Sequence, residues 1–317
     1  MDRAELRRLI VGPVAPVPTP FDENFEVDLG KMAELTQWWV ESGAVAGKCV
    51  IKIGAQAGEG EKLRESEWPA LLRTAVQAAG GKASIMGAIH HKDTVRAVED
   101  VKKAQDLGAM GLQISAAIFN SPNQDDHLRH YEAISDASEI GIMIYNTPWW
   151  PYGSMYPDTF RKMADFEHIV AIKWSPPEGV EYEEIFELKE TFNIIDNTVQ
   201  PVRNHKLGGR GYVQNEIGVY PAHDLKIWDL MESGRYDEAE SLFDSVVPKL
   251  RAFGGKIGKS SGHKGGAKAM MKLMGRPIGE QRPPATPLDA DEMIELRDLM
   301  AEFGWPMAEE ATAAAAD

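Results

Sequence analysis

The most restrictive feature of the chain is the alternation of eight short apolar runs with longer segments whose apolar residues recur at helical spacing. This alternation is typical of βα units around a parallel sheet. The predicted strands are Val14–Pro18, Val45–Ile53, Ser84–Ala88, Gly111–Ser115, Ile142–Asn146, Ile169–Trp174, Asn193–Asp196 and Gly211–Gln214. Eight such units favour an α/β fold closed into a (β/α)8 TIM barrel over an open doubly wound sheet.

After the eighth predicted strand the chain is helical, roughly from Ala222 to Phe303. We therefore divide it into a barrel at 10–221, a C-terminal helical extension at 222–306 and an Ala-rich tail at 307–317 that we expect to be disordered. A cluster of Pro and Gly at Gly275–Pro287 predicts a loop between the last two helices. A stripe at helical spacing, with Asp28 as its N-cap, predicts a helix of the barrel: Leu29, Met32, Leu35 and Trp39.

The charge balance limits the possible partners. There are 34 Lys and Arg against 49 Asp and Glu, a formal net charge of -15, so most of the surface would repel phosphate backbones and anionic lipids. No run approaches the roughly 18 apolar residues of a spanning helix. A single cysteine, Cys49, cannot form an internal disulfide, and the first residues lack the apolar core of a secretory signal. We expect a soluble cytoplasmic protein with no nucleic-acid or membrane partner.

Lys173 lies near the end of a predicted strand that is otherwise apolar. Burial favours the neutral form of a lysine, and a neutral amine is the form that attacks a carbonyl group to make a Schiff base. Tyr145 holds the matching place on the preceding strand. With the two-residue period of a strand, the inward-facing residues are predicted to be Ile169, Ala171 and Lys173, and Gly141, Met143 and Tyr145. Because neighbouring strands lie about 4.8 Å apart, the amine and the phenol should share one mouth of the barrel.

These two residue types fit imine chemistry. A lysine of ordinary pKa is neutral only about once in 2500 at neutral pH, whereas a shift of roughly three units raises that to about a third. A protonated imine eases proton loss or carbon–carbon cleavage beside it, and a nearby hydroxyl can move the protons. We interpret Lys173 as the imine-forming residue and Tyr145 as the proton shuttle. The plainer alternatives are a strand-end lysine that reaches solvent and a core tyrosine with a satisfied hydroxyl.

Other residues offer competing readings. Lys48 and Lys52 flank the second predicted strand and are rival amines, one of which could face the mouth, but no phenol stands opposite them. Paired histidines suggest a metal-dependent hydrolase, although the second pair falls on a helix predicted to lie outside the barrel: His90 and His91, and His127 and His130. We therefore expect no metal site.

Several motifs, in consistent order from about Gly12 to Phe303, resemble the dihydrodipicolinate synthase and N-acetylneuraminate lyase family. They are Pro16–Phe21, Gly58-Glu59 with Leu63 and Glu67, Tyr145–Pro148, Ala171–Lys173 and Lys268–Gly275. The resemblance implies a barrel with a C-terminal helical extension, usually a tetramer, and class I chemistry on pyruvate or a related 2-keto acid. It also implies that Lys173 forms the Schiff base, that Tyr145 handles protons, and that no metal or organic cofactor is needed.

The chain departs from that family at three places. The family commonly has two hydroxyl residues before Gly-Glu, whereas this chain has Gln56-Ala57, so carboxylate binding would fall to backbone N–H groups around Gly58 and to the Gln56 amide. Phe119 stands where synthases have a tyrosine that reaches a neighbouring subunit. Trp150 stands where they have an arginine that grips an acidic aldehyde, which disfavours such a substrate.

We therefore expect an aldolase or hydratase-aldolase that joins or separates pyruvate and an aromatic or apolar aldehyde, as in the aromatic-degrading branch of the family. The residues predicted to contact that substrate are Phe119, Trp149, Trp150, Tyr152, Asn197 and Gln214. Two alternatives stay open: an aldolase, dehydratase or synthase acting on sugar acids or other aliphatic 2-keto acids, and a catalytically silent barrel that binds keto acids.

Overall fold

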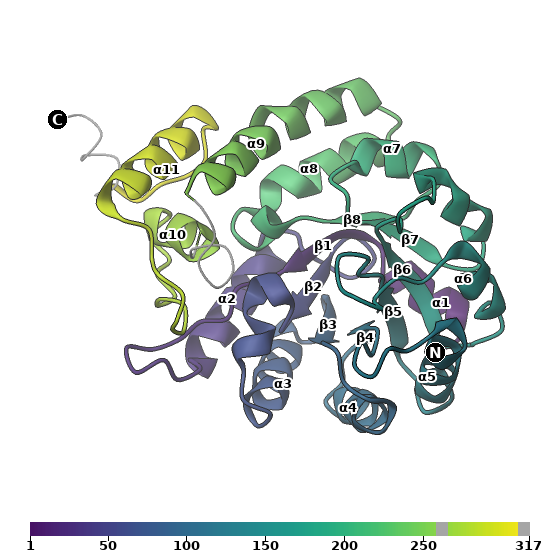
Figure 1. Cartoon of the computed structure of the whole chain (residues 1–317). Helices are drawn as coiled ribbons and strands as arrows, with labels where there is room; N and C mark the ends of the chain where they lie inside the picture. The colour runs from purple at the N-terminus through teal and green to yellow at the C-terminus, as the bar shows by residue number, and fades with distance from the viewer. Residues whose placement is uncertain (258–265, 310–317) are drawn as a thin grey trace.

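The computed structural model describes residues 1–257 and 266–309. Its eight parallel strands pair in sequence order, and β8 pairs with β1, so the sheet is a closed barrel as predicted. Figure 1 shows the strands at the centre with helices around them. The strands are β1 (Gly12–Pro16), β2 (Val50–Ile53), β3 (Ser84–Ile89), β4 (Gly111–Ser115), β5 (Gly141–Tyr145), β6 (Ile169–Trp174), β7 (Asn193–Asp196) and β8 (Gly211–Val213).

The strand limits differ most from the prediction at β2. The predicted strand Val45–Ile53 is wrong in its first half, because the chain turns there: the N–H groups of Lys48 and Cys49 both donate to the carbonyl of Val45. Gly47 supports these turns with a φ of 77°. The apolar run therefore begins in a turn and becomes a strand only at Val50.

The N-terminal helix lies across one end of the barrel, and the helices that follow most of the strands cover its outside. They are α1 (Arg3–Leu9), α2 (Leu29–Glu41), α3 (Glu67–Ala79), α4 (Thr94–Asp106), α5 (Gln124–Asp136), α6 (Pro157–Lys162), α7 (Pro201–Lys206) and α8 (Pro221–Glu232). Short 3₁₀ helices are η1 (Gln56–Gly58), η2 (Gly60–Lys62), η3 (Tyr182–Leu188) and η4 (Asn215–Gly218). Between β6 and β7 the covering element is therefore η3 rather than an α-helix. None of the helices in the described ranges combines the length and apolar character of a membrane span.

Helix α2 illustrates how local sequence sets these elements. The Asp28 side chain accepts a hydrogen bond from the Lys31 N–H at 2.8 Å, so it caps the helix as predicted. Of the predicted stripe, Met32, Leu35 and Trp39 are buried, but Leu29 is 38% exposed. Leu29 is the first residue of the helix and lies at the edge of the buried face.

The lower interior of the barrel is closed by the N-terminal helix α1, which the sequence analysis did not identify. Leu6 and Ile10 are fully buried in a cluster with inward side chains of the strands: Val14, Val50, Met86, Met143, Val170, Ala171 and Ile195. The predicted alternation on β6 is wrong below Ala171, because Val170 joins this inner cluster while Ile169 packs outside. A bulge explains the change: Ile142 pairs with Ile169, but the next residue, Met143, pairs with Ala171.

The C-terminal helices lie together on one side of the barrel (Figure 1). They are α9 (Tyr236–Lys256), α10 (Gly266–Leu273) and α11 (Ala290–Glu302), and the predicted loop Gly275–Pro287 lies between the last two. Helix α8 packs on β1 as well as on α9, so it completes the ring of helices. The division at 221 and 222 stays a prediction, and most of the predicted tail, 310–317, lies outside the described residues.

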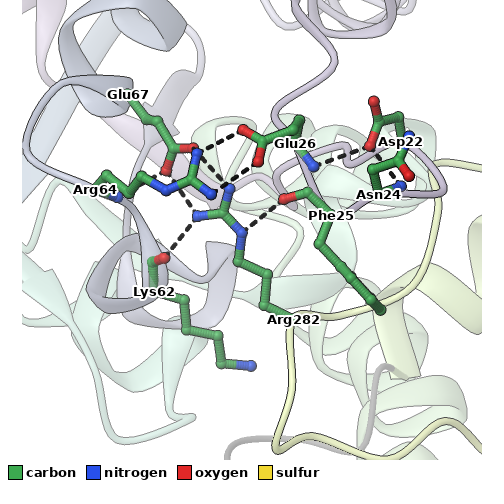
Figure 2. Close-up of polar contacts among 8 residues, drawn as sticks. All are labelled: Asp22, Asn24, Phe25, Glu26, Lys62, Arg64, Glu67 and Arg282. Carbon is green, nitrogen blue, oxygen red and sulfur yellow. Dashed lines mark hydrogen bonds and ion pairs between the residues drawn. The ribbon is translucent and has the colours of Figure 1, made fainter.

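An ion-pair network fastens this extension to the barrel (Figure 2). The Arg282 guanidinium donates two hydrogen bonds of 2.7 Å to the carboxylate of Glu67, at the start of α3, and one of 2.8 Å to the carbonyl of Lys62, at the end of η2. It also donates to the carbonyl of Phe25, in the loop after β1. Arg64 links Glu67 to Glu26 from the other side. The loops after β1 and β2 are thereby held by the chain that follows α10.

Candidate active site

Lys173 and Tyr145 lie side by side inside the barrel near the carboxyl ends of β6 and β5. They are direct partners in the β5–β6 register. The Lys173 Nζ lies 3.5 Å from the centroid of the Tyr145 ring, and the two residues are only 6% and 7% exposed. The carboxyl end of the strands is the face at which TIM-barrel active sites form. The predicted shared mouth for the amine and the phenol is therefore present in the fold.

Burial changes the ionisation of both groups. Desolvation, followed by the charge of Lys52, holds the pKa of Lys173 well below its ordinary value. Desolvation also raises the pKa of Tyr145 to about 12, although a hydrogen bond with the Asn197 side chain opposes this rise. At neutral pH the amine is therefore able to act as a nucleophile, while the phenol keeps its proton.

A cavity of about 280 Å³ opens at these two residues. Four of the predicted substrate-binding residues line it: Gln56, Ala57, Asn197 and Gln214. Asn197 is also oriented by a hydrogen bond from its Nδ2 to the Ser175 hydroxyl at 2.9 Å. Further lining residues are Pro16, Lys52, Ala55, Gln113, Val199, Val213, Asn215, Glu216 and Arg251. Much of this lining is polar.

Lys52 belongs to the same cavity, although the sequence analysis left it as a rival amine. It is fully buried, and its Nζ donates to the Gln113 Oε1 at 2.6 Å. Burial lowers the pKa of Lys52 to about 7. Lys48, the other rival, instead points outward and pairs with Asp229 at 2.8 Å. The signal that would have identified Lys52 is the one used for Lys173: a lysine inside an apolar strand, in phase with inward-facing Val50.

The lining of the cavity also includes a carboxyl group and a guanidinium group that sequence reasoning missed. Glu216 follows β8 in η4, and burial raises its pKa to about 7. Arg251 comes from α9 and lines the same cavity. No sequence signal pairs these residues, because α9 reaches the barrel mouth only through the fold.

Gly58 does not line the cavity but shapes the loop that does. A Cβ on Gly58 would lie 2.3 Å from the carbonyl oxygen of Val17, so only glycine fits this close approach. The Thr19 hydroxyl donates to the Gly58 carbonyl at 2.6 Å. The next residue, Glu59, is buried and pairs with Lys268 of α10 at 2.9 Å. The family motifs around Gly58-Glu59 and Lys268 therefore meet in space.

None of the four predicted aromatic residues lines this cavity. Trp149 packs edge-on against Tyr145, with 5.7 Å between ring centroids, and is 51% exposed. Trp150 contacts His91 in the same manner, and Tyr152 is exposed on the same loop. Phe119 is 69% exposed and lines a separate cavity beside α5. Substrate contact by these four residues stays a prediction.

The histidine pairs do not form a metal centre within the described part of the chain, where no group of three or more His, Cys, Asp or Glu side chains is placed to hold an ion. His127 and His130 lie on α5, outside the barrel. Burial lowers the pKa of His90 to about 3, so this residue is neutral at physiological pH.

Comparison with known proteins extends these observations. A model described as the dihydrodipicolinate synthetase family matches residues 9–303. The 4-hydroxy-tetrahydrodipicolinate synthase 1 of Halalkalibacterium halodurans is 27% identical over 287 residues, or 89% of this chain and 94% of that protein. The 4-hydroxy-tetrahydrodipicolinate synthase of Heliobacterium modesticaldum is 27% identical, covering 95% of this chain and 96% of its own. The solved dihydrodipicolinate synthase of Aquifex aeolicus has the same fold, with a TM-score of 0.84 at 23% identity, over 95% of this chain and 100% of that one.

Proposed function

The chain belongs to the dihydrodipicolinate synthetase family of class I, pyruvate-dependent Schiff-base lyases, and within this family we propose that Lys173 forms the imine and Tyr145 shuttles the protons. The observation that carries this proposal is the contact of a buried amine with a buried phenol at the carboxyl ends of two adjacent strands. Both line one cavity of about 280 Å³, the lower end of the size range of ligand pockets.

The proposed chemistry follows from the two pKa shifts. The neutral Lys173 amine attacks the keto carbon of pyruvate, and the Tyr145 phenol gives a proton to the oxygen that leaves as water. The protonated imine then stabilises negative charge on the adjacent carbon. In the synthetic direction that carbon loses a proton to the Tyr145 phenolate and bonds to an aldehyde. In the reverse direction the bond to the aldehyde carbon breaks, the aldehyde leaves, and the carbon that stays on the imine takes up a proton. Tyr145 is placed to exchange the proton of the aldol oxygen as well.

For the second substrate we propose an aromatic or apolar aldehyde, with hydration of an unsaturated precursor as an accompanying step. Trp149 supports this choice because its indole packs on the catalytic phenol while half of its surface is open to a ligand. Trp150 adds a second exposed indole on the same loop, in place of a charged clamp.

The polar lining of the cavity supports a second candidate, cleavage of hydroxylated aliphatic 2-keto acids such as sugar acids. Asn197, Gln214 and Glu216 offer hydrogen bonds that an aryl group would leave unpaired, and Arg251 offers a positive charge. We further propose a cytoplasmic protein that forms a homo-oligomer, since exposed aromatic side chains such as Phe119 and Trp149 are suited to a subunit contact.

A substrate comparison separates the two candidates. Pyruvate release is measured by coupling to lactate dehydrogenase, with aryl-substituted unsaturated pyruvates in one series and 2-keto-3-deoxy sugar acids in the other. A higher kcat/KM for the aryl series supports the aromatic proposal, and a higher value for the sugar acids replaces it with the second candidate. Absence of turnover in both series, together with tight binding of a pyruvate analogue, would instead indicate a silent binding barrel.

A further inference from the structure

Lys52 is an unusual residue for the middle of a barrel strand. It lies on β2 opposite Pro16 of β1 and Met86 of β3, and its side chain is fully buried. Within the described residues, the Lys52 ammonium group makes one hydrogen bond, to the neutral amide oxygen of Gln113, and no ion pair. Burying an ammonium group without a counter-ion lowers the free energy of unfolding, so Lys52 destabilises the folded protein.

Lys52 and Lys173 line one cavity, and two like charges in so poorly solvated a space strongly disfavour each other. The environment decides which amine carries the proton. The Gln113 oxygen accepts a 2.6 Å hydrogen bond from Lys52, whereas Lys173 faces the ring of Tyr145. Burial lowers the pKa of Lys52 to about 7, while burial followed by the charge of Lys52 holds the pKa of Lys173 well below its ordinary value.

We propose that Lys52 is a positioning residue for the imine chemistry: held on Gln113, its ammonium group keeps the neighbouring Lys173 amine unprotonated and ready to attack. This inference rests on the proposed role of Lys173. Gln113 has a role in this scheme as well, because its amide oxygen accepts a hydrogen bond from the Lys52 ammonium group and so favours the protonated form of Lys52.

Other ionisable groups face the two amines and could affect the same pH dependence. Tyr145 stays protonated to about pH 12, and His90 stays neutral because its pKa is about 3. Arg251 lines the outer cavity, and Glu61 acts on Tyr145 from the loop after β2. Glu216, with a pKa of about 7, titrates in the same range as Lys52 and is the group that an experiment must separate from it.

The test is the pH dependence of imine formation with pyruvate. The rate of borohydride-trapped adduct is measured from about pH 5.5 to about pH 9.5 for the unaltered chain and for Lys52→Met, Lys52→Arg and Glu216→Gln. In Lys52→Met the midpoint should rise by about one unit or more, so that the rate at pH values below the midpoint falls roughly tenfold and recovers as the pH is raised. Lys52→Arg keeps the charge and should keep the midpoint. Glu216→Gln should leave the rise caused by Lys52→Met in place when the two changes are combined.

A second variant guards against misfolding of Lys52→Met. In Gln113→Glu the new carboxylate neutralises the Lys52 charge, so the midpoint should rise again. An unchanged midpoint in both variants would overturn the inference, as would a loss confined to a higher KM for pyruvate, which would make Lys52 a carboxylate anchor. Peptide mapping of the borohydride-trapped adduct distinguishes failure of the Lys52 inference from failure of the proposed function. An adduct on Lys173 with an unchanged midpoint refutes only the role of Lys52. An adduct on Lys52 refutes the assignment of Lys173 as the nucleophile.

Discussion

Replacing Tyr145 by phenylalanine is the most informative single change in the cavity, because it removes one oxygen and leaves the ring in place. The ring contacts with Lys173 at 3.5 Å and Trp149 at 5.7 Å are kept, so the amine stays buried and the loop stays packed. The structural loss is the hydrogen bond with the Asn197 side chain, about 1 kcal/mol of folding free energy. The functional loss is a general acid and base, which is typically worth about 10² to 10⁴ in rate, or roughly 2.7 to 5.5 kcal/mol on the barrier.

We therefore expect kcat for pyruvate release to fall at least a hundredfold or so in Tyr145→Phe, while the melting temperature changes little. Tyr131→Phe is the matched control. Tyr131 is also buried, and its hydroxyl donates to the carbonyl of Ile114 at 3.1 Å, but it lies on α5 outside the cavity. It should show a comparable stability loss and unaltered kcat. If Tyr145→Phe kept kcat within about tenfold of the parent, the phenol would not be the proton carrier and the assignment would be refuted.

Three further predictions concern the scaffold. Arg282→Met leaves the Glu67 carboxylate, which is only 11% exposed, without its bidentate partner, so it should lower the free energy of unfolding in urea melts by about 2 to 4 kcal/mol. Arg64→Met removes a side chain that is 59% exposed and should lower it by less than about 1 kcal/mol. Equal losses would contradict the role of Arg282 in holding the extension to the barrel. Gly58→Ala places a Cβ 2.3 Å from a carbonyl oxygen and should raise KM for pyruvate by displacing the cavity loop; an unaltered KM would count against this geometry. Desolvation lowers the pKa of His130 from 6.5 to about 4, so between these pH values the unfolded state binds a proton that the folded state does not. The free energy of unfolding should therefore fall by about 1.4 kcal/mol for each pH unit from 6.5 down to about 4. His130→Leu should flatten this slope in melts at fixed pH, and an unchanged slope would refute the lowered pKa of His130.

Local patterns were sufficient for the fold class and for the central pair. The alternation of strands and helices predicted the barrel, and side-chain parity at Lys173 and Tyr145 predicted their shared mouth, because the two residues sit on neighbouring strands in register. Parity failed lower on β6, where the bulge at Val170 cannot be seen in a run of uniformly apolar residues. Helix α1 was not predicted because only two apolar side chains in this segment, Leu6 and Ile10, are buried against the interior of the barrel. Two residues are too few to form a visible stripe at helical spacing.

The rest of the cavity depended on long-range packing. Arg251 reaches the mouth from α9, and no spacing along the chain relates it to β6. Lys52 had the same strand signature as Lys173, and it was ranked lower because no phenol stood opposite; the structure instead supplies an amide, Gln113. Trp149 and Trp150 were predicted to contact substrate from their position after the motif Tyr145–Pro148. The direction of side chains in this loop depends on its internal hydrogen bonds, such as that from the Trp150 N–H to the Thr147 carbonyl.

The central claim is that the Lys173 amine is the nucleophile toward pyruvate. The direct measurement is reduction of the protein with borohydride in the presence of pyruvate, followed by digestion and mass mapping of every lysine-containing peptide, with Lys173→Met as the matched variant. We expect one reduced adduct on the peptide that carries Lys173, and none in the Lys173→Met variant. An unmodified Lys173 peptide, with turnover intact, would contradict it.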